Sequence, residues 1–225
     1  MTQRKFAITL WGMFFWLFPT MVYSQFKAIK PETFWGVSLG GCFSKVNFTP
    51  SLKTKMHTGV TLGASFRYIA EEYVGLLVEL NYQQAGWKDN LEGTPYTYER
   101  TLNYLELPAY VHIYFGKKKY RFYINIGPQF NFLIGESEKA NFAFDGSVTN
   151  NKYYQHYGKK VEKKIDYGLS GGVGFEWRTG VGCFLIGGSY YFGFSNLFNN
   201  DLSDTFSGSS NSIISLKLSY LFQVR

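Results

Sequence analysis

Residues 59–68, GVTLGASFRY, and residues 74–83, VGLLVELNYQ, decide the fold of this chain. In both stretches every second residue is apolar, from Val60 to Tyr68 and from Val74 to Tyr82. Such a period of two is typical of β-strands that present one apolar face and one polar face. Each apolar stripe spans about nine residues, which is the length that a tilted strand needs to cross the hydrocarbon of a bilayer.

The same alternation recurs along the rest of the chain, and no segment shows a convincing helical period. It predicts eight strands, at residues 35–44, 59–68, 74–83, 104–113, 122–132, 165–177, 184–193 and 214–223. Pro108 and Pro128 fall inside two of them, and since proline donates no hydrogen bond we expect a bulge or a broken bond at each.

The connections between these strands alternate in length. Short gaps lie around residues 70–72, 116–119 and 178–180, and long gaps at residues 45–56, 88–100, 134–164 and 194–211. Tight periplasmic turns and longer extracellular loops are typical of outer-membrane barrels. The sequence therefore predicts an all-β protein, an eight-stranded antiparallel up-and-down transmembrane β-barrel, in which residues 134–164 extend above the membrane as a hairpin.

The composition supports this prediction. Aromatic residues make up 20% of the chain and charged residues 17%, which argues against disorder. Aromatic residues also fall near the ends of the apolar stripes, as in the interfacial girdles of membrane barrels. A soluble periplasmic binding barrel of lipocalin type is the alternative, but its polar face would be rich in Lys and Glu, whereas here that face is mostly Gly, Ser, Asn and Gln.

The N-terminus has the pattern of a secretory signal peptide. Arg4 and Lys5 precede an apolar run at residues 6–18, and Ser24 fits a cleavage site. We expect residues 1–24 to be a cleaved signal peptide and residues 25–225 to form the barrel in the outer membrane. Cys42 and Cys183 are predicted at opposite heights of the barrel, too far apart for a disulfide.

Charged side chains on the polar face are few. An interior filled by side chains leaves little room for substrate, so we interpret them as a structural charge cluster. Its predicted members are Glu79, Glu106 and Lys217 near mid-height, and Arg67, Arg121 and Glu176 toward the periplasmic end. The pair Glu79 and Glu106 is also a conceivable acid/base dyad.

The sequence shows no signature of catalysis. GxSxG, P-loop, HExxH and GxGxxG motifs are absent, and His57, His112 and His156 are too far apart to share a metal. We predict no catalytic, cofactor-binding or metal site and no enzyme activity. The net charge of +7 comes largely from Lys residues in the connections, where they meet lipid phosphates or are simply solvated; it does not indicate nucleic-acid binding.

The chain resembles the PorT-like family of outer-membrane β-barrels, of the general OmpX/OmpA type. The resemblance covers nearly the whole mature chain and is most specific in ELNYQQAGW (residues 79–87) and NYLELPAY (residues 103–110). It implies an eight-stranded barrel without a residue-level functional motif. The founding member of that family is associated with the export of virulence proteases to the cell surface.

These observations favour a non-enzymatic outer-membrane barrel with a structural, adhesive or secretion-accessory role. A barrel enzyme acting on membrane lipid is the alternative besides the soluble binding barrel. We expect a monomer in outer-membrane lipid, with envelope or secreted proteins as partners. The predicted contact region is the long loop, through its exposed aromatic residues Phe142, Phe144, Tyr153, Tyr154 and Tyr157.

Overall fold

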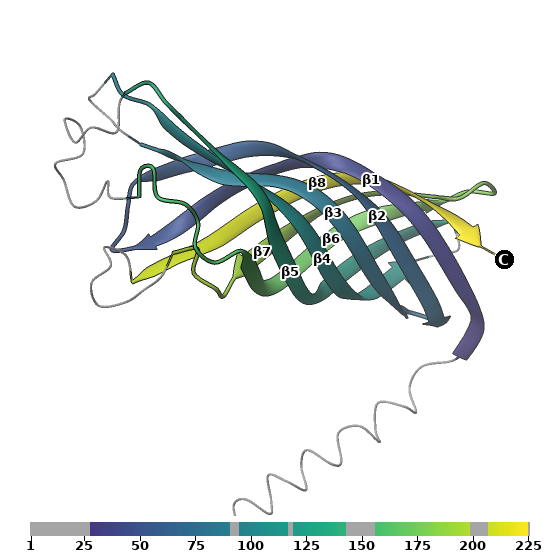
Figure 1. Cartoon of the computed structure of the whole chain (residues 1–225). Coiled ribbons are helices and arrows are strands. Elements are labelled where there is room, and N and C mark those ends of the chain that lie inside the picture. The colour runs from purple at the N-terminus through teal and green to yellow at the C-terminus, as the bar shows by residue number, and fades with distance from the viewer. Residues whose placement is uncertain (1–27, 91–94, 117–118, 143–155, 199–206, 225) are drawn as a thin grey trace, which may run out of the picture.

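The computed structural model describes residues 28–90, 95–116, 119–142, 156–198 and 207–224. Within them eight antiparallel strands close into one barrel in which each strand pairs with its neighbours in the sequence (Figure 1). The predicted fold is thereby confirmed. The strands are β1 (Ala28–Thr49), β2 (Thr54–Glu71), β3 (Val74–Asp89), β4 (Tyr98–Gly116), β5 (Tyr120–Ala140), β6 (Ile165–Arg178), β7 (Cys183–Gly193) and β8 (Gly208–Val224).

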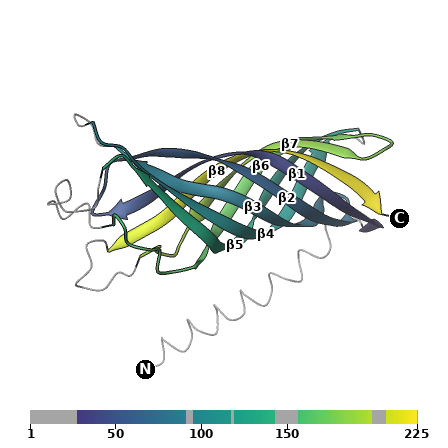
Figure 2. The ribbon, with the colours of Figure 1, turned by 45° about the horizontal axis from the view of Figure 1, so that its top comes forward.

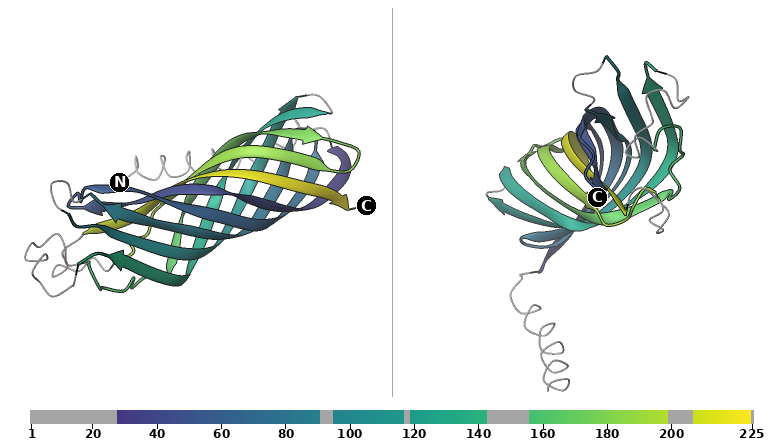
Figure 3. Two further views of the ribbon diagram at one scale, coloured as in Figure 1. Left: turned by 90° about the horizontal axis from the view of Figure 1, so that it is seen from above. Right: turned by 90° about the vertical axis from the view of Figure 1, so that its left-hand side faces the viewer.

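The first and last strands close the ring. β1 and β8 pair without a register shift from Thr33 opposite Val224 to Thr49 opposite Gly208. Because a closed ring has no strand edge, the ladder satisfies the backbone groups that an open sheet would leave bare in lipid. The right-hand view of Figure 3 shows the barrel from the end opposite the C-terminus.

The alternating apolar residues face outward and form a continuous lipid-facing band. Trp35, Tyr68, Phe122 and Trp177 lie toward one end of that band, and Phe132, Tyr167 and Phe192 toward the other, all at least 39% exposed. The aromatic residues therefore lie where interfacial girdles are expected. Among the described residues no helix is long and apolar enough to cross a membrane.

The two ends of the barrel differ. Residues 72–73 and 179–182 make short turns at the end where the C-terminus lies, and β4 and β5 also meet there with Gly116 opposite Arg121 (Figure 2). This is the periplasmic end by the usual asymmetry of such barrels. At the other end β4 and β5 rise well above the apolar band and pair with each other up to Tyr98 opposite Ala140. The expected hairpin of residues 134–164 is therefore wrong: residues 134–140 extend β5 against β4, residues 143–155 lie outside the described residues, and residues 156–164 form no strand.

Three details of the sequence prediction are corrected or remain open. The first long connection is only residues 50–53, because β1 and β2 continue to Thr49 and Thr54. Pro108 and Pro128 cause no bulge, since the register is the same on both sides of each, but the pairing is interrupted at both, in agreement with the predicted broken bond: the β3–β4 pairing skips from Val78–Ala109 to Asn81–Glu106, and the β4–β5 pairing skips from Pro108–Gln129 to Val111–Ile126. The register of the β4–β5 pair shifts between Asn103 and Tyr104. The signal peptide, residues 1–24, lies outside the described residues.

The two cysteines are free thiols, both buried. Cys42 lies opposite Gly59 of β2, and its Sγ donates to the carbonyl of Gln84. Cys183 begins β7 at the opposite end of the barrel, as predicted.

One part of the barrel wall is made of backbone alone. Gly174 of β6 and Gly187 of β7 are directly paired, and the Tyr123 side chain lies against them from inside the barrel. A Cβ atom built on Gly187 would lie 2.1 Å from the Tyr123 hydroxyl oxygen. These glycines are therefore required by close packing of Tyr123, not by a turn.

We expect the substitution Gly187→Ala to destabilise the barrel by about 1–3 kcal/mol, the usual cost of overpacking. The cost should shrink in a Tyr123→Phe background, because the atom that clashes is the hydroxyl oxygen. Urea unfolding of the refolded barrel in lipid vesicles measures both. Gly171→Ala is the matched control, since its Cβ would meet nothing closer than 3.8 Å; equal losses for Gly187→Ala in both backgrounds would contradict this packing.

Candidate functional site at the extracellular mouth

The periplasmic half of the interior is filled around a buried ion pair. Arg67 of β2 donates from Nη1 to Glu176 of β6 at 2.8 Å and from Nη2 at 3.2 Å, and both side chains are fully buried. The Arg67 guanidinium also lies 4.4 Å from the centre of the Phe34 ring. A two-pronged pair of this kind satisfies both charges inside the barrel.

Polar groups at mid-height are also bound to one another. Lys217 of β8 donates to Glu79 of β3, which also accepts from Asn81 at 3.1 Å. Glu106 of β4 does not join Lys217 but accepts from Gln83 Nε2 at 2.6 Å. The two glutamates thus lie in separate hydrogen-bonded groups.

Arg121, like Glu106, has no ion pair among the interactions of the described residues. Its guanidinium carbon lies 4.3 Å from the centre of the Tyr114 ring. Nearby, Arg178 donates to Glu32 at 2.8 Å and closes the periplasmic end. The interior is therefore filled from its periplasmic end to mid-height, and the cavity between these groups measures about 30 Å³.

We expect Glu176→Gln to cost about 3–5 kcal/mol of unfolding free energy, because it leaves Arg67 buried without a counter-charge. The double substitution Arg67→Met with Glu176→Met should recover most of that loss. Unfolding in urea tests both. Lys88→Ala removes the half-exposed pair with Glu99 and should cost at most about 1 kcal/mol; a similar loss for Glu176→Gln would refute the argument.

The inner face of the extracellular extension carries a second charged group. Arg100 of β4 donates to Glu136 at 2.5 Å and forms an ion pair with Glu138 at 2.7 Å, both on β5. Its guanidinium carbon lies 5.6 Å from the centre of the Trp87 ring. Trp87 and Arg100 are almost completely buried although they lie above the apolar band.

Residues 156–164, called here the mouth segment, fold into the open end and cover these side chains. The Asp89 carboxylate accepts from the Tyr157 hydroxyl at 2.7 Å and lies 3.0 Å from His156 Nε2. Glu136 and Glu138, already bound to Arg100, also accept from the backbone N–H groups of Val161 and Gly158 at 3.2 Å. Three carboxylates on β3 and β5 thus fix the segment.

A second segment packs beside the first. The N–H groups of Leu197 and Phe198 donate to the Ser209 hydroxyl at 3.0 and 3.1 Å. The carbonyl of Leu197 accepts from Glu162 and Lys163 of the mouth segment at 3.2 and 3.1 Å. Leu197 and Phe198 join Trp87 and Tyr157 in one buried apolar cluster, which seals the mouth.

The predicted aromatic contact residues do not all lie on the surface. Tyr157 is only 9% exposed, so its assignment as an exposed partner contact is wrong; Asp89 and the apolar cluster hold it inside. Phe142 is half-buried and packs against both Tyr157 and Tyr96, with ring centres 5.3 and 5.5 Å apart. Phe144, Tyr153 and Tyr154 lie outside the described residues.

Sequence reasoning missed the mouth cluster. Asp89, Tyr98 and Arg100 lay in a predicted loop, yet Tyr98, Arg100, Leu102 and Tyr104 continue the inward alternation of β4. That period of two was the signal available. Burial raises the pKa of the Tyr98 hydroxyl, which lies in this extramembrane part.

The three histidines have different partners. His57 contacts Thr101 at 3.0 Å above the membrane, His112 contacts Asn125 at 2.7 Å in the periplasmic half, and His156 lies in the mouth. Burial lowers the pKa of His57, which favours the neutral form of this side chain. The described residues contain no group of three ligands suited to a metal ion.

We expect Asp89→Ala to loosen the mouth segment, because His156 and Tyr157 lose their shared acceptor. Trypsin cleavage after Lys159 or Lys160 on intact cells should become roughly tenfold faster. This is the increase in local opening expected if the hydrogen bonds to Asp89 stabilise the closed mouth segment by about 1.4 kcal/mol. Ser137→Ala, on the exposed side of β5, is the control. An unchanged cleavage rate in Asp89→Ala would show that the contacts of Asp89 do not hold the mouth segment closed.

A closed antiparallel barrel with an apolar outer band, aromatic residues near its ends and short turns at one end has the architecture of outer-membrane β-barrel proteins. The chain belongs to the outer membrane protein beta-barrel domain family, which matches residues 23–199. No curated protein sequence matches the chain.

The chain is also similar, at low identity, to solved outer-membrane barrels. Neisserial surface protein A is 12% identical, with 83% of this chain and 96% of that chain covered and a TM-score of 0.45. Ail of Yersinia pestis is 14% identical, with 85% and 99% covered and a TM-score of 0.40. OprG of Pseudomonas aeruginosa is 12% identical, with 87% and 97% covered and a TM-score of 0.41. Such identities concern the fold alone.

Proposed function

We propose that this protein is a non-enzymatic, monomeric outer-membrane barrel that acts by protein contact at its extracellular end. The observation that carries the proposal is the sealed mouth, where residues 156–164 and Leu197–Phe198 occupy the space through which a substrate would enter. The small interior cavity also leaves no room for turnover of a substrate.

The contact surface that we propose is the rim formed by Tyr96 and Phe142. Tyr96 is 37% exposed, and Phe142 behind it is backed by Tyr157, which packs on Tyr98 with ring centres 4.4 Å apart. The exposed aromatic edge is therefore supported by a rigid column of buried rings. Rigid aromatic side chains lose little entropy on binding and are common anchors of protein interfaces.

The resemblance to PorT-like proteins favours an envelope or secreted protein as the partner, by analogy only. The sealed barrel is compatible with a secretion-accessory role, since an accessory protein needs a docking surface and not a channel. The predicted export by a signal peptide cleaved near Ser24 fits the same location in the outer membrane.

The test is the double substitution Tyr96→Ser with Phe142→Ser in the full chain. The barrel should assemble normally, because both residues lie above the membrane, while the secreted-protein profile should match that of the deletion strain. Losing such an anchor costs about 2 kcal/mol or more, a roughly thirtyfold loss of affinity.

Tyr73→Ser is the matched control, since Tyr73 is a 44% exposed aromatic residue at the periplasmic turn. Full complementation by the rim variant would overturn the proposed contact surface. A deletion strain with an unaltered secreted-protein profile would overturn the secretion role.

A further inference from the structure

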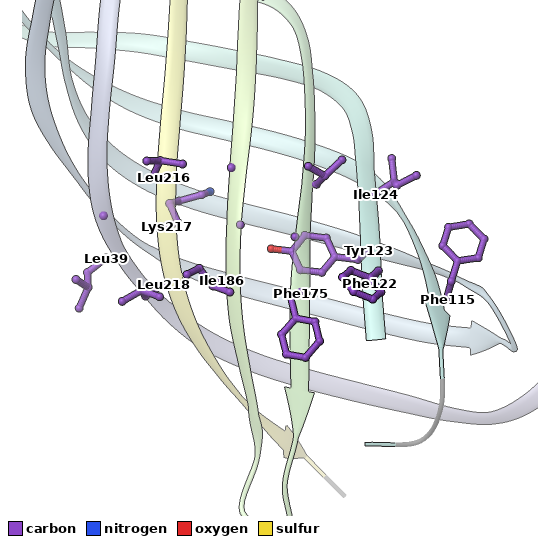
Figure 4. A pocket seen from close by; sticks show the side chains of 15 residues that line it. Leu39, Phe115, Phe122, Tyr123, Ile124, Phe175, Ile186, Leu216, Lys217 and Leu218 are labelled. Carbon is purple, nitrogen blue, oxygen red and sulfur yellow. The ribbon is translucent and has the colours of Figure 1, made fainter. Parts of the chain in front are cut away.

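The lipid-facing wall is not uniform but carries an apolar hollow of about 800 Å³. Its side chains come from six neighbouring strands, from β4 and β5 across β6 and β7 to β8 and β1 (Figure 4). They include Phe122, Ile124, Val173, Ile186, Leu216 and Leu218.

A missing side chain forms part of the floor of this hollow. Gly188 lies on the outward face of β7, between Ile186 and Tyr190. A Cβ atom built on it would lie 3.2 Å from Leu216 Cδ2, and the next nearest atom would be the Ser215 carbonyl oxygen at 3.8 Å. Ile186 and Val173 beside it are 58% and 62% exposed. The glycine thus leaves a depression between large apolar side chains.

The polar residues that line the hollow belong to the barrel interior. Tyr123 lies behind the paired glycines Gly174 and Gly187, and Lys217 donates to Glu79 inside the barrel. Neither offers a free charge to the outer face. The outer surface of the hollow therefore suits a hydrocarbon ligand.

The periplasmic rim of the hollow supplies the complementary charge. Phe122 and Phe175 pack with ring centres 5.4 Å apart, and Phe175 stacks on Tyr120 at 5.9 Å. Lys119 Nζ lies 5.5 Å from the centre of the Tyr120 ring, and Lys119 is exposed. A cation thus lies at the headgroup level, below an apolar hollow.

We propose that the hollow is a binding site for a glycerophospholipid of the periplasmic leaflet, with an acyl chain across Gly188 and the phosphate near Lys119. The hollow is continuous with the lipid-facing band and extends from Phe115 and Phe122 near the periplasmic turns to Gly188 and Leu216. A second copy related by a two-fold axis through the hollow would place hollow against hollow and leave both unfilled. A flexible acyl chain fits this concave surface.

The test compares Gly188→Leu, which fills the hollow, with Gly171→Leu, an outward glycine one row above it with nothing nearer than 3.8 Å. The full mature chain is mixed with phosphatidylglycerol in detergent micelles, and native mass spectrometry records the lipid retained. The unmodified chain and Gly171→Leu should retain one lipid tightly, and Gly188→Leu should retain it roughly tenfold more weakly, the equivalent of about two lost methylene contacts.

A second pair of variants leaves the glycines unaltered in case Gly188→Leu does not fold. Val173→Trp covers the hollow, whereas Val60→Trp lies in the band outside it. If the phosphate contact is present, the chain should retain diacylglycerol with the same acyl chains less tightly than phosphatidylglycerol. The variant Lys119→Glu should likewise retain phosphatidylglycerol less tightly than the unmodified chain. Equal retention by the filled and unfilled variants, or a dimer that only the filled variants abolish, would overturn the lipid site.

Discussion

Closure of the β1–β8 ladder is the constraint on which the rest of the molecule depends. In lipid an unpaired backbone group has no water to bind, so the ring has to close, and eight strands enclose a space that only side chains can fill. Every polar side chain directed inward is then removed from bulk water. The ion pair Arg67–Glu176 and the contact of Lys217 with Glu79 follow from that requirement, since each charge needs a partner at its own height.

The same requirement explains the extracellular end. Where β4 and β5 leave the apolar band, their inner faces still alternate, but the neighbouring strands β6 and β7 no longer rise with them, since β5 pairs with β6 only as far as Phe132 opposite Ile165. Arg100 and Trp87 would be left half-covered there. The mouth segment supplies the missing cover and uses Glu136 and Glu138 twice, once for Arg100 and once for its own backbone. A loop that would otherwise be free for binding is thereby committed to packing.

The packing of the mouth segment is a feature that the sequence does not predict. Period-two alternation determines strand number, topology and the two faces, because those depend on local pattern. The position of Tyr157 depends on an acceptor that lies 68 residues away in the sequence, and no pattern around Tyr157 reveals Asp89. Similarly, Glu106 and Glu79 looked equivalent on the strand map, yet the register gives Glu106 the amide of Gln83 and gives Glu79 the ammonium of Lys217.

Glycine in the wall has consequences on both of its faces. At Gly174 and Gly187 the absent side chains point inward, and Tyr123 occupies their space. At Gly188, one residue further along β7, the absent side chain would point outward, into the hollow that we propose holds an acyl chain. A wall reduced to backbone retains its ladder hydrogen bonds but has few dispersion contacts of its own. Its packing therefore comes from Tyr123 on the inner side and from the molecules that cover the hollow on the outer side. The stability of this part of the barrel should thus depend on the surrounding lipid more than that of the strands whose outer faces carry large apolar side chains.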